Sequence, residues 1–399
     1  MRSNYKKLGQ FIQQVSVKNS DLTVDNLLGV SITKKFIPSI ANIIGTDMTI
    51  YKIVQKGQFA YGPVTSRNGD KISVALLEND EAIVSTSYTV FEIINTNELL
   101  PEYLMMWFRR EEFDRYARYM SHGSTREAFG WEEMCDVELP VPSLEKQNEI
   151  IKEYHTITDR IKLNEQLNQK LEDTAQSIYK EWFVNFEFPH NFSHSELDSE
   201  SNIKPYKSNG GEMVYCDELE MEIPNNWQIV ELIDMLDIKY GKDYKHLNNG
   251  EIPLYGSGGI MKYVDKYLYS GESILIPRKG SLNNIIHINQ EFWTVDTMFY
   301  SIIKTKFSGK YLFHILKSID FYSLNVGSAV PSMTTNLLNG LKNLKPENYV
   351  LENFEKILIP IFKHKSILKD ENETLERLKE VLLSKIATID ENEKVVIKK

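Results

Sequence analysis

The 399-residue sequence is poor in cysteine and in long apolar runs. Its two cysteines, Cys135 and Cys216, do not support a disulfide framework and favour a reducing compartment. No uninterrupted apolar stretch approaches the roughly 18 residues of a membrane-spanning helix. The N-terminal stretch MRSNYKKLGQFIQQV lacks the apolar segment of a secretory signal. These absences predict a cytoplasmic protein that does not interact with a membrane.

The motifs of common enzyme classes are also missing. We find no phosphate-binding loop, no metal-binding C-x-x-C or H-E-x-x-H spacing, and no Asn-Pro-Pro-aromatic tetrapeptide of an amino-methyltransferase. The stretch YGSGGI (255–260) is rich in glycine but lacks dinucleotide-binding spacing, so it is expected to form a turn. The pattern favours a recognition or scaffold protein over an enzyme, and we predict no catalytic residue and no metal ligand.

Positive charge is scarce in the chain as a whole but not in every part of it. The net charge of −10 argues against nucleic-acid binding over the whole surface. Between Lys239 and Lys310, however, there are ten Lys or Arg residues and six Asp or Glu residues. The acidic average is therefore compatible with a basic face on one part of the molecule.

What the sequence does contain is a repeat with a period of about 200 residues. Four segments of the first half have counterparts in the second half, in the same order. The pairs are GQFAYGP (57–63) with GESILIP (271–277), STSYTVFEI (85–93) with TVDTMFYSI (294–302), PEYLMMWF (101–108) with GKYLFHIL (309–316), and GSTREAFGWEEMCDVELPVP (123–142) with GSAVPSMTTNLLNGLKNLKP (327–346). Four pairs at a nearly constant offset predict a duplicated domain.

A long stretch with helical periodicity ends each half. Because such a helix is longer than its own domain, we expect the two helices to pair antiparallel as a coiled coil with pseudo-two-fold symmetry. The alternative is that each helix packs on its own domain. Pro360 should kink or interrupt the second helix. The predicted fold is α+β, with related domains over 1–142 and 226–346, helical regions over 143–188 and 347–399, and a polar linker over 189–225.

Polar loops with the chemistry of DNA recognition follow the matched prolines in both halves. Arg and Lys side chains can donate hydrogen bonds to guanine, and an Asn side chain can pair with the edge of adenine. Hydroxyl groups and backbone amides can donate to phosphate oxygens. An ordinary polar turn is the alternative for each segment. The predicted DNA-binding residues are Thr65, Ser66, Arg67 and Asn68 in the first loop and Arg278, Lys279, Ser281, Asn283 and Asn284 in the second. Further predicted residues are Ser124, Thr125, Arg126, Ser328 and Ser332, in the two matched segments that begin with Gly-Ser (123–142 and 327–346, the Gly-Ser segments).

Several stretches together resemble the specificity subunits of Type I restriction–modification systems. They are GSTREAFGWEEMCDVELPVPSLEKQNEII, LNQKLEDTAQSIYKEWFVNFEFP, EIPNNWQIVEL, IPLYGSGGI, VDTMFY and GSAVPSMTTNLLNGLKNLKP, which cover nearly the whole chain. One departure is LKPENYVLENFEKI, which lacks the usual proline–glutamate–glutamine start of the second conserved helix. The position at which that helix begins therefore stays open.

The resemblance implies a non-catalytic subunit whose two target-recognition domains each read one half of a split double-stranded DNA sequence. Its helices would dock two methyltransferase subunits. The chain itself would bind no cofactor; S-adenosylmethionine would bind to the partners, as would ATP and Mg in complexes that include restriction (translocase) subunits. The alternative function is a coiled-coil scaffold that does not bind DNA.

Overall fold

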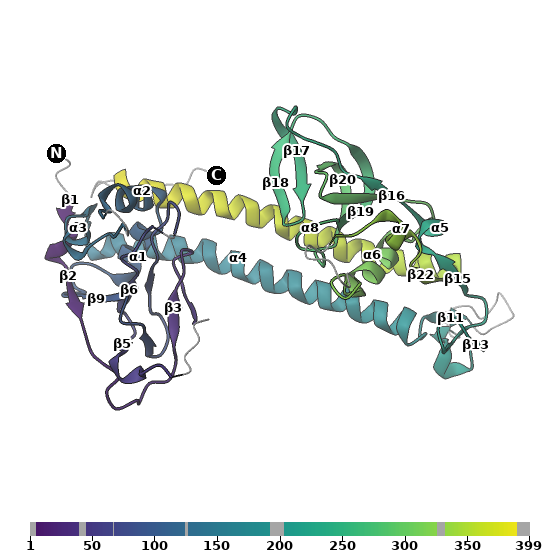
Figure 1. Ribbon diagram of the computed structural model, residues 1–399, viewed down its shortest axis with the longest axis horizontal. Coiled ribbons are helices and arrows are strands. Elements are labelled where there is room, and N and C mark those ends of the chain that lie inside the picture. The colour runs from purple at the N-terminus through teal and green to yellow at the C-terminus, as the bar shows by residue number, and fades with distance from the viewer. Residues whose placement is uncertain are drawn as a thin grey trace. The chain divides into compact units, whose positions relative to one another are not determined.

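The computed structural model describes residues 5–39, 45–66, 68–123, 127–191, 203–324 and 332–388 (Figure 1). The chain divides into two compact units: unit 1 comprises 1–165 and 369–399, and unit 2 comprises 166–368. Each unit contains one globular domain and parts of the two long helices, α4 (Leu144–Tyr179) and α8 (Asn348–Lys385). None of the helices in the described ranges has the length and apolar character needed to cross a membrane.

Unit 1 is built around a four-stranded antiparallel sheet of order β2-β9-β6-β7. On it, Phe59 and Phe91 lie opposite each other on neighbouring strands with ring centroids 4.8 Å apart, and Phe108 packs against both rings. Such cross-strand aromatic pairs stabilise a sheet and its register. The strands are β2 (Ile12–Val15), β6 (Phe59–Tyr61), β7 (Val74–Leu76) and β9 (Thr89–Ile93), with the pairs β1 (Tyr5–Lys7) and β10 (Glu138–Pro140), β3 (Leu28–Val30) and β4 (Phe36–Pro38), and β5 (Lys52–Val54) and β8 (Ala82–Val84); the short helices are α1 (Pro101–Phe108), α2 (Glu111–Met120) and α3 (Trp131–Cys135).

Unit 2 is built around a six-stranded sheet of order β16-β21-β19-β20-β17-β18. All neighbours are antiparallel except β17 and β20. The strands are β16 (Leu236–Tyr240), β17 (Asn249–Gly256), β18 (Gly259–Val264), β19 (Tyr269–Pro277), β20 (Ile286–Thr294) and β21 (Met298–Ile303), with a separate pair of β15 (Gln228–Glu231) and β22 (Lys342–Lys345); the short helices are α5 (Leu232–Met235), α6 (Gly309–Ser318) and α7 (Thr335–Asn339).

The two units share one topology. The order β2-β9-β6-β7 in unit 1 corresponds to β16-β21-β19-β20 in unit 2, and the pair β1–β10 corresponds to β15–β22. A buried tyrosine at the same place in α1 and α6 makes the same hydrogen bond in both units: Tyr103 Oη donates to Pro140 O (3.1 Å), and Tyr311 Oη donates to Leu344 O (2.5 Å). The predicted α+β fold with a duplicated domain is confirmed.

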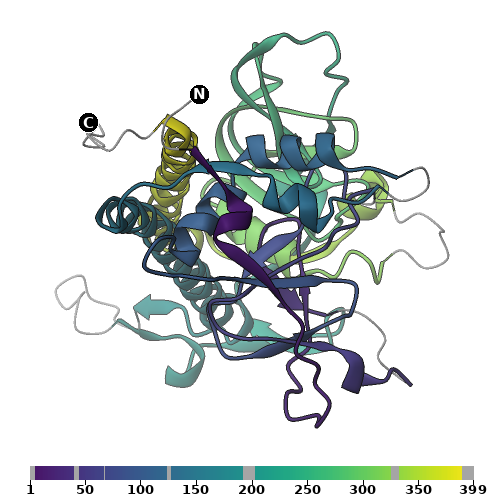
Figure 2. The same cartoon turned by 90° about the vertical axis from the view of Figure 1, so that its left-hand side faces the viewer.

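The long helices pair within each unit, as predicted. In unit 1, Ile150 and Ile161 of α4 share a core with Leu382 of α8, and Asn164 Nδ2 donates to Asn372 Oδ1 (2.8 Å). Figures 1 and 2 both show these parts of α4 and α8 side by side. In unit 2, Glu172 contacts Lys365, and Trp182 packs on Phe354 with ring centroids 5.7 Å apart. A later residue of α4 thus meets an earlier residue of α8, so the pairing is antiparallel.

Of the kink or interruption expected at Pro360, the interruption is not observed. The helix α8 begins at Asn348 and continues through Pro360 to Lys385. Pro360 is exposed, so solvent can hydrate the carbonyl that loses its hydrogen bond, while Leu358 and Phe362 beside it pack into the core of unit 2. Packing of the flanking turns holds the helix together.

The region between the two domains has regular structure where it is described. Two hairpins form there, β11 (Pro189–Asn191) with β12 (Ile203–Pro205), and β13 (Met213–Cys216) with β14 (Met221–Pro224). Their support is aromatic: the Phe188 ring stacks on Tyr206 and Trp227, with centroids 4.6 and 5.3 Å apart. Of these three aromatic residues only Tyr206 lies within the polar stretch 189–225, so the composition of that stretch gave no sign of the cluster.

Candidate nucleic-acid interface

In unit 1, the two segments predicted to bind DNA lie together. Val64 of the β6–β7 loop (62–73) forms a β-bridge with Ala128 of the Gly-Ser segment. Phe129 N donates to Pro63 O (2.8 Å) and the amide of Thr65 donates to Glu127 O (3.0 Å). Backbone contacts therefore join segments that are about 60 residues apart in sequence.

Unit 2 repeats this arrangement. Lys279 of the β19–β20 loop (278–285) forms a β-bridge with Ser332 of the second Gly-Ser segment, and Met333 N donates to Arg278 O (2.9 Å). Met333 and Phe129 occupy equivalent places in the two Gly-Ser segments, and both are buried. An equivalent backbone connection thus brings both predicted segments together in each unit.

The predicted residues of the β6–β7 loop have different environments. Ser66 is exposed, and Asn68 is half-buried: its backbone N donates to Thr65 O (2.9 Å) and its side-chain Nδ2 donates to Val64 O (3.4 Å). Thr65 is buried, and its hydroxyl lies within hydrogen-bond distance of Ser121 Oγ (3.0 Å) and Glu127 O (3.2 Å). Thr65 thus holds the loop, whereas Ser66 and Asn68 are accessible. The predicted residues Arg67, Ser124, Thr125, Arg126 and Ser328 lie outside the described residues.

In the β19–β20 loop, the two asparagines fix the backbone. Asn283 Nδ2 donates to Asp320 Oδ1 (3.2 Å), and its Oδ1 accepts from Phe321 N (3.0 Å). Asn284 Nδ2 donates to Ser257 O (2.8 Å). Lys279 and Ser281 are exposed at this loop. Lys279 and Ser281 therefore offer one ammonium group and one hydroxyl, and the side-chain amides of the two asparagines support the backbone beside them.

Beside the predicted Arg278, the structure adds Tyr240 and Lys242, which the motif comparison missed. The guanidinium of Arg278 lies over the ring of Tyr240, 5.4 Å from its centroid, and this contact orients the arginine. Lys242 is exposed, and its backbone N donates to Thr294 O (2.9 Å). Tyr240 is itself 49% exposed, which leaves ring surface available for stacking. The signal in the sequence was KYGKDYK (239–245), an aromatic and basic run at the start of the positively charged stretch.

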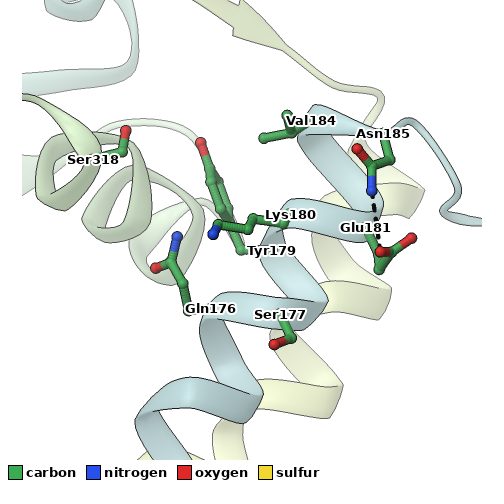
Figure 3. Close-up of a pocket in the computed structure, with 8 residues that line it drawn as sticks. All are labelled: Gln176, Ser177, Tyr179, Lys180, Glu181, Val184, Asn185 and Ser318. Atoms are coloured by element: carbon green, nitrogen blue, oxygen red, sulfur yellow. Dashed lines mark hydrogen bonds between the residues drawn. The ribbon is translucent and has the colours of Figure 1, made fainter.

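A pocket of unit 2 lies elsewhere and contains none of the predicted DNA-binding residues (Figure 3). It lies where α4 passes into a π-helical turn, Lys180–Val184. Burial raises the pKa of Tyr179 to about 12, and Asn185 Nδ2 donates to Glu181 (3.1 Å). The lining has no nucleophile paired with a base. It consists of Gln176, Ser177, Tyr179, Lys180, Glu181, Val184, Asn185 and Ser318.

A second polar cluster connects α6 to both long helices inside unit 2. Burial alone would raise the pKa of Glu172, but ion pairs with Lys317 and Lys365 lower it to about 2. Next to it, His314 is fully buried, stacks on the ring of Tyr179, and its Nδ1 donates to Gln176 Oε1 (3.0 Å). Burial lowers the pKa of His314 to about 4, so this histidine is neutral at pH 7. Within the described ranges, no group of three His, Cys, Asp or Glu side chains could hold a metal ion.

Comparison with known proteins agrees with this architecture. Residues 30–173 and 224–377 each match the family described as the type I restriction modification DNA specificity domain. The MjaIX specificity subunit of Methanocaldococcus jannaschii, a type I restriction enzyme subunit, is 24% identical over 344 residues, covering 78% of this chain and 73% of that protein. The HindI specificity subunit of Haemophilus influenzae is 31% identical over 150 residues, covering 37% of this chain and 32% of that protein.

A solved structure shows the same fold. The specificity subunit of a type I restriction–modification system from M. genitalium superposes with a TM-score of 0.57 at 15% sequence identity, over 96% of this chain and 95% of that one. The two family matches fall on the two globular domains and extend into the helix that follows each of them. The chain belongs to the family of type I restriction–modification DNA specificity subunits and carries the family's domain twice.

Proposed function

We propose that each unit reads one half of a bipartite double-stranded DNA target, as the recognition subunit of a type I restriction–modification complex. The observation that carries the proposal is the equivalent bridge, Val64–Ala128 in unit 1 and Lys279–Ser332 in unit 2, which joins a polar loop to a Gly-Ser segment. One fold with different side chains at the same place can recognise two different sequences. Arg, Lys, Asn and Ser side chains supply contacts to base edges and phosphates.

The two long helices would dock two methyltransferase subunits. Both helices expose apolar side chains that a partner would cover: Leu163 on α4 is 53% exposed, and Ile359 and Ile367 on α8 are 50% and 52% exposed. Adenine methylation with S-adenosylmethionine would take place on those partners, and ATP- and Mg-dependent cleavage on restriction subunits where these are present. The chain would bind no cofactor itself and would work in the cytoplasm, where the DNA is.

A coiled-coil scaffold that does not bind DNA is the second candidate. The paired helices and their exposed apolar residues suit such a scaffold equally well. It gives no reason, however, for polar loops at equivalent places in both units. The proposal and this alternative therefore make different predictions about the loops.

Crosslinking from the loops tests the proposal. A photoreactive amino acid at Ser66 or at Ser281, both exposed, is introduced into the chain assembled with its methyltransferase partners. We expect the residue at 66 to crosslink only to one half-site and the residue at 281 only to the other. The same group at Lys56, which precedes β6 while the loop follows it, is the control and should not crosslink. Crosslinking of both loop positions to the same half-site, or of neither to DNA, would refute the proposal.

A further inference from the structure

The β3–β4 hairpin of unit 1 is connected to the β6–β7 loop by a buried ion pair between Lys34 and Asp114 of α2, both of which hydrogen-bond to the backbone of Ile72. Lys34, at the turn of this hairpin, is 6% exposed; its Nζ lies 2.5 Å from Asp114 Oδ1 and donates to Ile72 O (2.9 Å). The same carboxylate oxygen accepts from Ile72 N (3.0 Å). Lys34 and Asp114 together therefore hold both backbone groups of a residue in the β6–β7 loop.

The buried ion pair fixes the position of the hairpin turn beside the β6–β7 loop, at a cost in stability. Burial lowers the pKa of Lys34 while Asp114 opposes that effect, and a buried ion pair generally adds less stability than well-packed apolar residues would. Lys34 also has a positive φ of 63°, which is unfavourable for a side chain of this size. A hydrogen bond from Val30 N to Tyr88 Oη (3.3 Å) also holds β3, the strand before the turn. The turn is thereby placed at a defined position beside the loop.

The tip of this hairpin presents groups suited to an anion. Thr33 and Lys35 are exposed there, and residues 28–38 contain no Asp or Glu. Lys71, on the adjoining loop, is also exposed and lies close enough to Lys34 to affect its pKa. The charge of Lys34 is balanced by the buried carboxylate of Asp114, and Asp70 directly precedes Lys71 on the adjoining loop, so the excess positive charge of the turn comes from Lys35. The tip therefore carries net positive charge.

Unit 2 places a different turn beside its own loop. The turn between β17 and β18 is held by the hydrogen bond from Asn284 Nδ2 to Ser257 O. Gly280 has a φ of +85°, which favours glycine, and a Cβ there would lie 2.6 Å from Ser257 Oγ, so a side chain at this position would be strained and would displace the serine hydroxyl. At the outer side of the turn, Gly258 is exposed and has no atom within 4 Å of a Cβ position. This open turn, in the stretch YGSGGI, leaves backbone and hydroxyl groups accessible to a close neighbour.

We infer that the turns 31–35 and 256–259 are a third DNA-binding element of their respective domains, which contacts the sugar–phosphate backbone beside each half-site. The inference rests on the proposed function and extends it. In unit 1 the contact is made by Lys35 and the Thr33 hydroxyl; in unit 2 it is made by the glycine-rich backbone and Ser257. Because phosphates are the same in every sequence, these turns add affinity and orientation and do not change which bases are read.

Substitution of Lys35 tests the inference in unit 1. In the chain assembled with methyltransferase partners, we expect Lys35→Ala to weaken DNA binding by about tenfold and to lower the salt slope of the affinity by about one. The loss of affinity should be the same for the intact target and for DNA with altered half-sites. Lys56→Ala, which removes another exposed lysine ahead of β6, is the matched control and should bind as the unmodified chain does.

The corresponding test in unit 2 is Gly258→Asp, for which the turn has room, with Gln228→Glu on β15 as a control that adds the same charge away from the turn. We expect about tenfold weaker binding for Gly258→Asp alone. Unchanged affinity and salt slope in Lys35→Ala and Gly258→Asp, with crosslinks from positions 66 and 281 intact, would overturn this inference and leave the proposed function standing. Absence of those crosslinks would instead overturn the proposed function and this inference with it.

Discussion

Replacing Arg67 and Asn68 together by alanine should weaken recognition of one half-site by about 10- to 100-fold and leave the other half-site unchanged. A well-placed side chain that contacts a base contributes roughly 1–3 kcal/mol of discrimination. Both residues belong to the β6–β7 loop of unit 1, and Asn68 is accessible there. The loop of unit 2 is built from other residues, so its contacts are not affected.

The measurement is binding of the assembled complex to three DNAs: the intact target and targets with one or the other half-site altered. The variant should lose its preference for the correct first half-site and keep its preference for the second. Lys279→Ala with Ser281→Ala is the mirror experiment, because both side chains are exposed on the equivalent loop. A folded Arg67/Asn68 variant that loses both preferences would contradict separate recognition by the two units.

Acidification from pH 7 to pH 5 should lower the free energy of unfolding of unit 2 by about 2 kcal/mol through His314 alone. In the folded chain the pKa of this histidine is about 4, against an ordinary value of 6.5. The unfolded chain therefore binds a proton as the pH falls below 6.5, whereas the folded chain does not until about pH 4. Stability is present above pH 6.5 and is lost progressively between these two values.

Denaturant unfolding at several pH values measures this effect. The loss between pH 7 and pH 5 should be smaller by about 2 kcal/mol in His314→Gln than in the unmodified chain. His364→Gln, which removes an exposed histidine of α8, is the matched control for the loss of a histidine side chain. An unchanged pH dependence in His314→Gln would show that the histidine is not buried in neutral form between α6 and the long helices.

The duplication was predictable because its best-matched segments contain core positions. Tyr103 and Tyr311 occupy the same place in PEYLMMWF and GKYLFHIL and make the same hydrogen bond. Phe129 and Met333 lie at the same place in the two Gly-Ser segments and are buried in both units. Sequence similarity was retained where packing and backbone geometry limit the choice of residue.

The register of the strands was not predictable in the same way. Sequence comparison aligns Tyr61 with Leu275 and Thr89 with Met298. In the sheets, Tyr61 pairs with Thr89, but Met298 pairs with Pro277, two residues further along. Side chains alternate between the two faces of a strand, so a shift of two residues keeps the same pattern of buried and exposed positions. The sequence pattern cannot distinguish these alignments.

The surface around the loops depends on contacts that no local pattern reveals. Lys34 stands in ITKKF, where a lysine is expected to be exposed, yet it is buried against Asp114, 80 residues away. Ser257 and Asn284 are likewise brought together only by the folded sheet. The sequence therefore predicted the loops themselves, and the structure was needed to find the turns beside them.

The central claim is that two domains of one fold each recognise their own half-site. A genome-wide map of methylated adenines, in cells that produce this chain with its methyltransferase partners, tests it most directly. We predict a single target of two short fixed sequences separated by a constant number of unspecified base pairs, of which the Arg67/Asn68 variant changes only one. A contiguous target, or a change in both fixed sequences, would contradict the claim.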